Sequence, residues 1–248
     1  MPLRRFFVPP AQIRDGVATL PSGQAHHLRH VLRLEAGTQV EVFDGEGRAW
    51  AGAVRFTGGG VRVLLQRALE AHEEPGLRIT LALAIIRQDR FEWAIEKATE
   101  LGVAHIVPVE ARFSEIRVPP EKLPARIERW SRIAGEAARQ SERTTVPRIL
   151  PPVTAAGLFQ LPEISQSSKL WFHERSGDRP NRTSAEGGRL ALVVGPEGGW
   201  HESETEAARN AGCRIVTLGP RILRSETAAL AALAVFQCGW GQSTPPGE

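Results

Sequence analysis

Leu190-Ala191-Leu192-Val193-Val194-Gly195-Pro196-Glu197-Gly198-Gly199 is the stretch that decides the fold. Its first five residues are apolar without polar alternation, which is typical of a strand covered on both faces by helices. A helix is expected from roughly Glu202 to Ala211, because carboxylates lie in its first turn and Gly212 is placed to end it. The stretch therefore predicts the strand, loop and helix of an α/β protein.

A second unit repeats this plan directly afterwards. Cys213–Leu218 is the expected strand, Gly219–Arg224 is the loop, and Ser225 is the expected N-cap of an apolar helix that runs through Phe236. Loops that follow parallel strands emerge at the same edge of the sheet, where α/β proteins usually bind ligands. The two loops together predict one ligand site, whereas a single loop of this kind would be read equally well as a tight glycine turn.

The residues of these loops narrow the choice of ligand. Neither loop contains G-x-G-x-x-G or G-x-x-x-x-G-K-[ST], so the two common phosphate-binding fingerprints are absent. Glu197 would repel a pyrophosphate but would tolerate a cofactor that carries hydroxyls and positive charge. S-adenosylmethionine, with its sulfonium, amine and ribose, fits these loops.

The same residues resemble a known family. Leu192–Gly199 and Leu218-Gly219-Pro220-Arg221-Ile222-Leu223-Arg224-Ser225-Glu226-Thr227-Ala228 are similar to the paired signatures of the bacterial 16S ribosomal RNA uracil-N3 methyltransferases, which belong to the SPOUT or α/β-knot superfamily. Ser225 stands where that family often has threonine. The resemblance extends to Arg5-Phe6-Phe7, His27–Arg33 and Val42–Gly45, which are similar to the family's N-terminal PUA-like domain, and to Phe91–Val103.

The resemblance implies a fold, a cofactor and a set of partners. It implies a C-terminal SPOUT-type α/β knot, a parallel sheet with a deep trefoil knot, preceded by a small PUA-like β-barrel. It also implies S-adenosylmethionine as methyl donor, 16S ribosomal RNA of the small ribosomal subunit as substrate, and a homodimer with the active site at the subunit interface. The strand end at Phe172 and His173 is placed beside the adenosine. The cofactor-binding residues are then Phe172, His173, Gly195, Glu197, Gly198, Gly199, Leu218, Gly219, Leu223 and Thr227.

The reaction assigns roles to three further residues. Loss of the proton on uracil N3 makes that atom nucleophilic and spreads charge onto O2 and O4, so cationic donors near these oxygens favour the reaction. Arg221 and Arg224 are the expected donors. Glu226 either accepts the proton or holds one of these arginines by a charge-assisted bond, and the holding role is the favoured interpretation.

Six arginines are the candidate RNA contacts. The chain has 248 residues, 42% of them hydrophobic, and a net charge of +3, and its only lysines are Lys97, Lys122 and Lys169. Arginine binds phosphate through two N–H groups and stacks on bases, although genomic base composition also favours arginine. The candidates are Arg4, Arg5, Arg29 and Arg33 in the PUA-like region, and Arg139 and Arg143 in a segment that matches the family. An ordinary solvated surface is the alternative for each.

The rest of the chain predicts two domains. Short alternating strands separated by glycines predict a β-barrel over 1–72, interrupted by a helix around Ala25 to Leu34 with Leu28, Val31 and Leu32 on its apolar face. Residues 77–243 form the predicted methyltransferase domain. It begins with a strand from Ile79 to Ile86, a helix started by an Asp89–Glu92 capping box, and a strand from Ala104 to Val109. A further amphipathic helix is expected from about Pro124 to Glu142.

Several features are expected to be absent. No apolar run is long enough for a bilayer and no signal peptide is recognisable, so we expect no membrane partner and a cytoplasmic protein. His26 and His30 have the spacing of a zinc pair, but no third ligand lies nearby, and no metal is expected. Cys213 and Cys238 lie in apolar contexts and are expected to be buried free thiols.

Two other functions stay open at this point. One is an RNA-binding ribosome assembly factor without catalytic activity, with a vestigial cofactor pocket. The other is a methyltransferase of the same superfamily that modifies the ribose 2′-OH, a reaction that needs no acidic ring proton.

Overall fold

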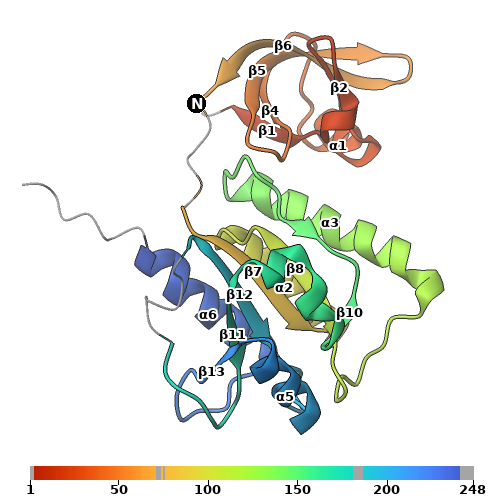
Figure 1. The fold of residues 1–248 in the computed structure, drawn as a ribbon. Helices are drawn as coiled ribbons and strands as arrows, with labels where there is room; N and C mark the ends of the chain where they lie inside the picture. The colour runs from red at the N-terminus through yellow and green to blue at the C-terminus, as the bar shows by residue number, and fades with distance from the viewer. Residues whose placement is uncertain (1–2, 71–73, 75, 181–186, 241–248) are drawn as a thin grey trace, which may run out of the picture. The chain divides into compact units, whose positions relative to one another are not determined.

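The structure is a computed structural model that describes residues 3–70, 74, 76–180 and 187–240, with side chains up to 237. The chain divides into two compact units (Figure 1). Unit 1 comprises Met1–Glu74 and Gly135–Val146, and unit 2 comprises Pro75–Ala134 and Pro147–Glu248. The predicted domains were continuous ranges, so the inclusion of Gly135–Val146 in unit 1 differs from that prediction.

Unit 1 is built on a curled six-stranded sheet in the order β1-β4-β5-β6-β3-β2. The β1–β4 pair is parallel and the other pairs are antiparallel. The strands are β1 (Arg4–Phe7), β2 (Ile13–Arg14), β3 (Val17–Thr19), β4 (Gln39–Phe43), β5 (Ala49–Thr57) and β6 (Gly60–Leu69). Alternate side chains of these strands are buried, as the sequence pattern predicts.

A β-bulge bends the longest hairpin of unit 1. The register of β5 against β6 shifts between Ala51 and Gly52. A Cβ at position 52 would lie 2.3 Å from the Leu64 backbone oxygen, so only glycine allows the two strands to approach this closely. The bend helps the sheet to curl around a core that includes Phe6, Leu28, Val40, Val54 and Val63.

The helical insert of unit 1 begins earlier than predicted and changes its geometry. Helix α1 (Ser22–His26) continues into the π-helix η2 (His27–Val31), and a short 3-10 helix η1 (Pro10–Gln12) precedes them. Leu28 is fully buried, but Val31 is 62% exposed. The prediction that Val31 lies on the apolar face was wrong, because the wider π-helical turn rotates it away from the direction that 3.6 residues per turn gives.

The segment Gly135–Val146 joins unit 1 through apolar and charged contacts. Ala138 and Val146 pack with Phe43 and Phe7. A Cβ on Gly135 would lie 2.9 Å from the Phe7 ring, so glycine permits close packing there. Burial of these side chains explains why the end of helix α3 (Leu123–Gln140) belongs to unit 1, whereas its first residues belong to unit 2.

Unit 2 contains a seven-stranded sheet in which every pairing is parallel. Its strand order is β10-β8-β7-β12-β11-β13, with β9 also paired to β8. The strands are β7 (Arg78–Ala84), β8 (His105–Glu110), β9 (Arg148–Ile149), β10 (Val153–Thr154), β11 (Ser168–Phe172), β12 (Arg189–Val194) and β13 (Arg214–Val216). The apolar run of the deciding stretch is therefore a central strand, β12, as predicted.

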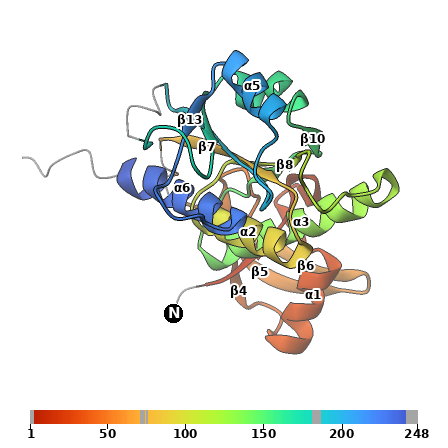
Figure 2. The ribbon, with the colours of Figure 1, turned by 90° about the horizontal axis from the view of Figure 1, so that it is seen from below.

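Helices cover both faces of this sheet (Figure 2). Helices α2 and α6 pack against each other, and α6 packs on β7 and β12. The opposite face packs on α5 and the short helix α4, through residues such as Ala208 and Ile164. The helices are α2 (Gln88–Glu100), α4 (Pro162–Ser165), α5 (Glu202–Asn210) and α6 (Ser225–Trp240), with 3-10 turns η3 (Pro120–Lys122) and η4 (Gly157–Gln160). This arrangement explains the continuous apolar strands.

Helix α2 begins differently from the prediction. It starts at Gln88 after Arg87, and no side chain caps it, so the Asp89–Glu92 capping box was wrong. Glu92 instead accepts two hydrogen bonds from Arg129 of α3, at 2.5 Å from Nε and 2.8 Å from Nη2. These bonds hold the pKa of Glu92 below its usual value.

Helices α5 and α6 start at the ends of the two loops. At α5, His201 accepts from the Ser203 N–H and Glu204 accepts from the His201 N–H, which forms a capping box. At α6, Ser225 is the first helical residue, and the carbonyl of Arg224 accepts the Ala228 N–H over 2.8 Å. The prediction of Ser225 as N-cap was therefore off by one residue.

Candidate functional site

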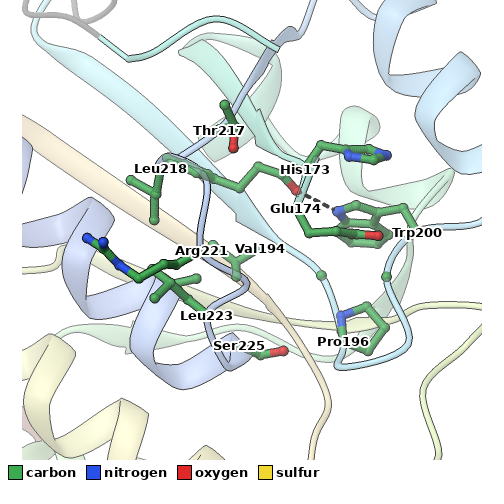
Figure 3. Close-up of a pocket in the computed structure, with 14 residues that line it drawn as sticks. His173, Glu174, Val194, Pro196, Trp200, Thr217, Leu218, Arg221, Leu223 and Ser225 are labelled. Carbon is green, nitrogen blue, oxygen red and sulfur yellow. Dashed lines mark hydrogen bonds between the residues drawn. The ribbon is translucent and has the colours of Figure 1, made fainter. Parts of the chain in front are cut away.

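A pocket of about 490 Å³, including its open mouth, lies at the carboxyl ends of β11, β12 and β13 (Figure 3). Strand β11 lies between β12 and β13, so the two loops predicted from the sequence flank the end of a third strand. The lining residues are Phe172, His173, Glu174, Val194, Gly195, Pro196, Gly199, Trp200, Thr217, Leu218, Arg221, Leu223, Ser225 and Ala228.

The end of β11 forms the middle of the pocket. Phe172 is buried, and the His173 N–H donates to the Val216 carbonyl of β13 over 2.8 Å. Glu174 follows, with its carboxylate beside Gly199 of the first loop. Backbone hydrogen bonding therefore fixes the floor of the pocket, and a carboxylate lies at its edge.

The first loop is held by its glycines and by Trp200. The Gly199 N–H donates to the Pro196 carbonyl over 2.9 Å, and Gly199 has a φ of +74°, which favours glycine. Trp200 donates from Nε1 to the Phe172 carbonyl over 3.1 Å. A Cβ on Gly195 would lie 2.8 Å from that same Nε1. The loop therefore closes tightly against the indole ring.

The second loop supplies the opposite wall. Gly219 has a φ of +122°, and its N–H lies 3.4 Å from Thr217 Oγ1. Leu218 and Leu223 add apolar surface, and Arg221 is exposed beside the pocket. Because the wall combines apolar side chains with a hydroxyl, it suits a nucleoside more than an isolated phosphate.

The structure brings together part of the predicted site. The predicted residues that line the pocket are Phe172, His173, Gly195, Gly199, Leu218, Leu223 and Arg221. The predicted residues that do not line it are Glu197, Gly198, Gly219, Thr227, Arg224 and Glu226. Thr227 and Arg224 are exposed at the start of α6, and Gly198 faces Phe113. No bound molecule tests these roles, and all of them stay predictions.

Glu226 has a different partner from the one expected. Its Oε1 lies 3.8 Å from Nε of Arg90, on α2, and Nη1 of Arg90 donates to Glu197 Oε1 over 3.2 Å. The sequence predicts instead that Glu226 holds Arg221 or Arg224. Arg90 is far from Glu226 in the chain, and no local pattern points to it.

Several other residues that line the pocket were not predicted from the sequence. Trp200 and Pro196 lie next to predicted positions, and Thr217 directly follows β13. The rule that ligands bind at the carboxyl ends of parallel strands would have found Thr217. Ser225 and Ala228 line the pocket because α6 starts there, one residue earlier than expected.

The lining suits the cofactor expected from the sequence. Arg221 is the only arginine or lysine among the described residues that line the pocket, and Glu174 adds a carboxylate. This charge pattern disfavours a polyphosphate and tolerates a cationic group. The apolar walls at Val194, Leu218 and Leu223 suit an adenine ring. The residues present therefore fit S-adenosylmethionine.

The six candidate RNA arginines fall into two classes within unit 1. Arg4, Arg29 and Arg33 are exposed, and Arg29 also donates to the Gly60 carbonyl over 2.8 Å. Arg5 pairs with Glu41 at 2.7 Å, and its guanidinium lies 4.8 Å from the centre of the Phe43 ring. Arg139 pairs with Glu136 at 2.9 Å, and Arg143 pairs with Glu74 at 3.0 Å. The second class already has intramolecular partners, and phosphate binding by all six stays a prediction.

The histidine pair of unit 1, the helices and the cysteines bear on metal binding, membrane spanning and thiol chemistry. The rings of His26 and His30 lie 4.5 Å apart, and the portion of the chain with described positions contains no group of three or more potential metal ligands. None of the helices in that portion has the length and apolar content of a membrane span. Cys213 is a buried free thiol, and burial raises its pKa to about 11. The side chain of Cys238 lies outside the described residues.

Comparisons with known proteins identify the family of the chain. A family profile described as an RNA methyltransferase domain matches residues 72–237, and one described as an RNA methyltransferase PUA domain matches residues 20–59. The chain is 35% identical to ribosomal RNA small subunit methyltransferase E of Synechocystis over 241 residues, which is 93% of this chain and 76% of that protein. The Bacillus subtilis protein of the same name is 30% identical, with 94% and 96% of the two chains covered.

A solved structure shares the whole fold. The ribosomal RNA small subunit methyltransferase E of Neisseria gonorrhoeae, bound to S-adenosylmethionine, is 33% identical and superposes with a TM-score of 0.83. The match covers 96% of this chain and 98% of that one. The parallel sheet and the curled sheet therefore occur together in a known methyltransferase. The chain belongs to the ribosomal RNA small subunit methyltransferase E family.

Proposed function

We propose that this protein transfers a methyl group from S-adenosylmethionine to N3 of a specific uridine in 16S ribosomal RNA of the small ribosomal subunit. S-adenosylmethionine-dependent methylation of small-subunit ribosomal RNA follows from family membership. The choice of 16S uridine N3 as the methylated atom goes further and rests on the loop signatures. The observation that carries the proposal is the pocket between the two loops.

The cofactor would be held by the pocket lining. Phe172, Leu218 and Leu223 would provide apolar contact for the adenine. The carboxylate of Glu174 lines the pocket and would tolerate the positively charged groups of the cofactor. The predicted contacts of Glu197, Gly198, Gly219 and Thr227 belong to this proposal as well. When bound, S-adenosylmethionine supplies an electrophilic methyl group on a sulfonium.

The residues of the second loop would activate the uracil. Arg221 is exposed beside the pocket, and Arg224 is exposed directly before α6. Guanidinium groups near O2 and O4 of the base would stabilise the anion that forms when N3 loses its proton. Glu226 would either hold Arg221 or Arg224, the favoured role, or accept the N3 proton, and its present ion pair is with Arg90.

RNA phosphates would be held by the arginines of unit 1. Arg4, Arg29 and Arg33 are exposed to solvent and could contact phosphates, although Arg29 already donates to the Gly60 carbonyl, and a small PUA-like domain is a suitable carrier for them. Arg5, Arg139 and Arg143 would contact RNA only by sharing or exchanging their present partners. The protein would act in the cytoplasm, where ribosomal subunits are found.

The homodimer and the knot are parts of the same proposal. Ile222 in the second loop and Val235 on α6 are 66% and 49% exposed, which supports an apolar subunit interface beside the pocket. After edge strand β13, the chain returns to the middle of the sheet, where α6 packs on β7 and β12. The trefoil knot is proposed from the family resemblance alone.

Mapping the methyl group tests the proposal. The protein is incubated with undermethylated small ribosomal subunits and labelled S-adenosylmethionine, and the modified nucleoside is located by mass spectrometry. Label on N3 of one uridine is the expected result. Label on a ribose 2′-oxygen would show that the protein is a ribose methyltransferase and not a base methyltransferase. Binding of RNA without any binding of the methyl donor would favour the assembly factor.

A further inference from the structure

Arg90 contacts one carboxylate from each side of the pocket. Its Nη1 donates to Glu197 Oε1 over 3.2 Å, and its Nε lies 3.8 Å from Glu226 Oε1. Glu197 belongs to the first loop, and Glu226 is the second residue of α6, directly after the second loop. Arg90 itself comes from a third element, the first turn of α2. One guanidinium therefore joins the first loop to the start of α6, where the second loop ends.

The burial of the three side chains shows which contact matters most. The Glu226 side chain is 10% exposed, that of Arg90 is 28% exposed and that of Glu197 is 37% exposed. The second carboxylate oxygen of Glu226, Oε2, is buried without a hydrogen-bond partner among the residues that the structure describes. A buried carboxylate is costly unless a cation compensates it. The ion pair with Arg90 supplies that compensation for Glu226.

The chemistry of arginine suits this position. Its planar guanidinium presents N–H donors at fixed angles, so one side chain can bind two carboxylates in a defined arrangement. A lysine would supply the charge without fixing the angle between its partners. Because α2 packs against α6, the backbone of Arg90 is itself held beside the start of α6.

We propose that Arg90 is a positioning residue for methyl transfer, which fixes the second loop and Glu226 relative to the first loop. This inference rests on the proposed function of the pocket. Arg90 does not line the pocket, so it acts through Glu197 and Glu226. The floor of the pocket has its own anchors, the His173–Val216 and Trp200–Phe172 hydrogen bonds. Loss of Arg90 therefore disturbs the reacting geometry more than the affinity for the methyl donor.

The test compares four variants with the wild-type protein: Arg90→Gln, Arg90→Lys, Glu226→Gln and the double variant of Arg90→Gln with Glu226→Gln. Lys97→Gln is the matched control, because Lys97 lies on the same helix and pairs with Glu96 at 2.7 Å and Glu100 at 2.8 Å, both within α2. The measurements are kcat on undermethylated small ribosomal subunits, the Kd of S-adenosylmethionine by calorimetry, and the melting temperature.

The expected result is a split between turnover and binding. In Arg90→Gln, kcat falls about tenfold or more while the donor Kd changes less than about threefold, because misplacement affects the reacting geometry first. Arg90→Lys recovers part of kcat. The double variant loses less than the product of the two single losses, since both changes affect one contact. Lys97→Gln keeps the wild-type kcat and Kd.

Three outcomes overturn the inference and one overturns the proposed function. Wild-type kcat in Arg90→Gln shows that Arg90 has no role in turnover. Parallel losses of kcat, donor affinity and melting temperature show a purely structural role. If Arg90→Gln does not fold, Arg90→Lys decides: a reduced kcat at an unchanged melting temperature supports the inference, and a wild-type kcat overturns it. A wild-type protein that neither binds the donor nor methylates RNA fails at the proposed function instead.

Discussion

Trp200 donates a 3.1 Å hydrogen bond from its indole N–H to the backbone carbonyl of Phe172. This contact fixes the residue after the first loop to the end of strand β11. The indole also stacks on Trp171, with ring centres 3.9 Å apart, and Trp200 is only 8% exposed. The wall of the pocket is therefore held in place at Trp200, and the indole ring leaves no space for a side chain at position 195.

Gly195→Ala should weaken binding of the methyl donor. The added Cβ would lie 2.8 Å from Trp200 Nε1, so the indole must move and its hydrogen bond to Phe172 is strained. We expect a rise in the donor Kd of about tenfold and a loss of about 1–2 kcal/mol of stability, as for other overpacked sites. Calorimetry and denaturant unfolding measure both. Gly76→Ala is the control, because nothing lies within 4 Å of a Cβ there; equal effects of the two substitutions would contradict the account.

Arg224→Ala should abolish methylation and leave donor binding within about tenfold of the wild type. Arg224 is exposed and does not line the pocket, so its proposed role is to stabilise charge on the uracil and not to hold the donor. Methyl transfer to undermethylated subunits and calorimetry with S-adenosylmethionine are measured on the same preparation. Arg209→Ala, at an exposed arginine of α5, serves as the control. Loss of both activities together would mean that Arg224 holds the cofactor.

Ile222→Glu should separate the proposed dimer. Ile222 is 66% exposed, and a carboxylate at an apolar interface is desolvated without a partner. We expect the mass from light scattering to fall to that of one chain, with loss of methylation because the site is proposed to lie at the interface. Val31→Glu, at a residue of unit 1 that is 62% exposed, should keep the wild-type mass. A wild-type protein that is monomeric and fully active would refute the interface.

His105 should make stability depend on pH below about 6.5. Burial lowers the pKa of His105 from its ordinary value of 6.5, so the unfolded chain binds a proton more readily than the folded one. Its contribution is present above the unfolded pKa and is lost as pH falls through the lower folded-state pKa. The free energy of unfolding of the wild type should therefore fall relative to His105→Asn between pH 6.5 and 5. A constant difference between the wild type and His105→Asn over this pH range would exclude this role.

The sheet of unit 2 was largely predictable from its sequence. Its strands at 78–84, 105–110 and 189–194 are mostly apolar runs, and the last is followed by the Gly-Pro loop at 195–199. Helix ends were less predictable, as at Asp89, where a capping box was expected. Glu92 instead bonds to Arg129, because a tertiary ion pair competes with the local cap.

The division of the chain into its two compact units was harder to predict from the sequence. Nothing in the pattern of Gly135–Val146 distinguishes packing on Phe7 and Phe43 from packing within unit 2. Both environments require the same small and apolar side chains. The helical periodicity of the segment therefore predicts which face is buried, but it does not predict which unit that face packs against. The exposure of Val31 was likewise missed, since helical periodicity assumes 3.6 residues per turn and η2 is a π-helix.

The two loops of the site were found from sequence, but their connections were not. Gly195, Gly199 and Leu218 line the pocket as expected. The link through Arg90 depends on the packing of α2 against α6, which the sequence does not encode locally. Strand order is also a tertiary property, so the position of β11 between β12 and β13 followed only from the structure.

The central claim is that the pocket at the ends of β11, β12 and β13 binds a methyl donor. Diffraction from crystals soaked separately with S-adenosylmethionine and with ATP tests it most directly. The account predicts density for S-adenosylmethionine against Gly195, Gly199 and Leu218, and none for ATP at that place. An empty pocket in the crystal soaked with S-adenosylmethionine, together with ATP bound in the pocket of the other crystal, would contradict it.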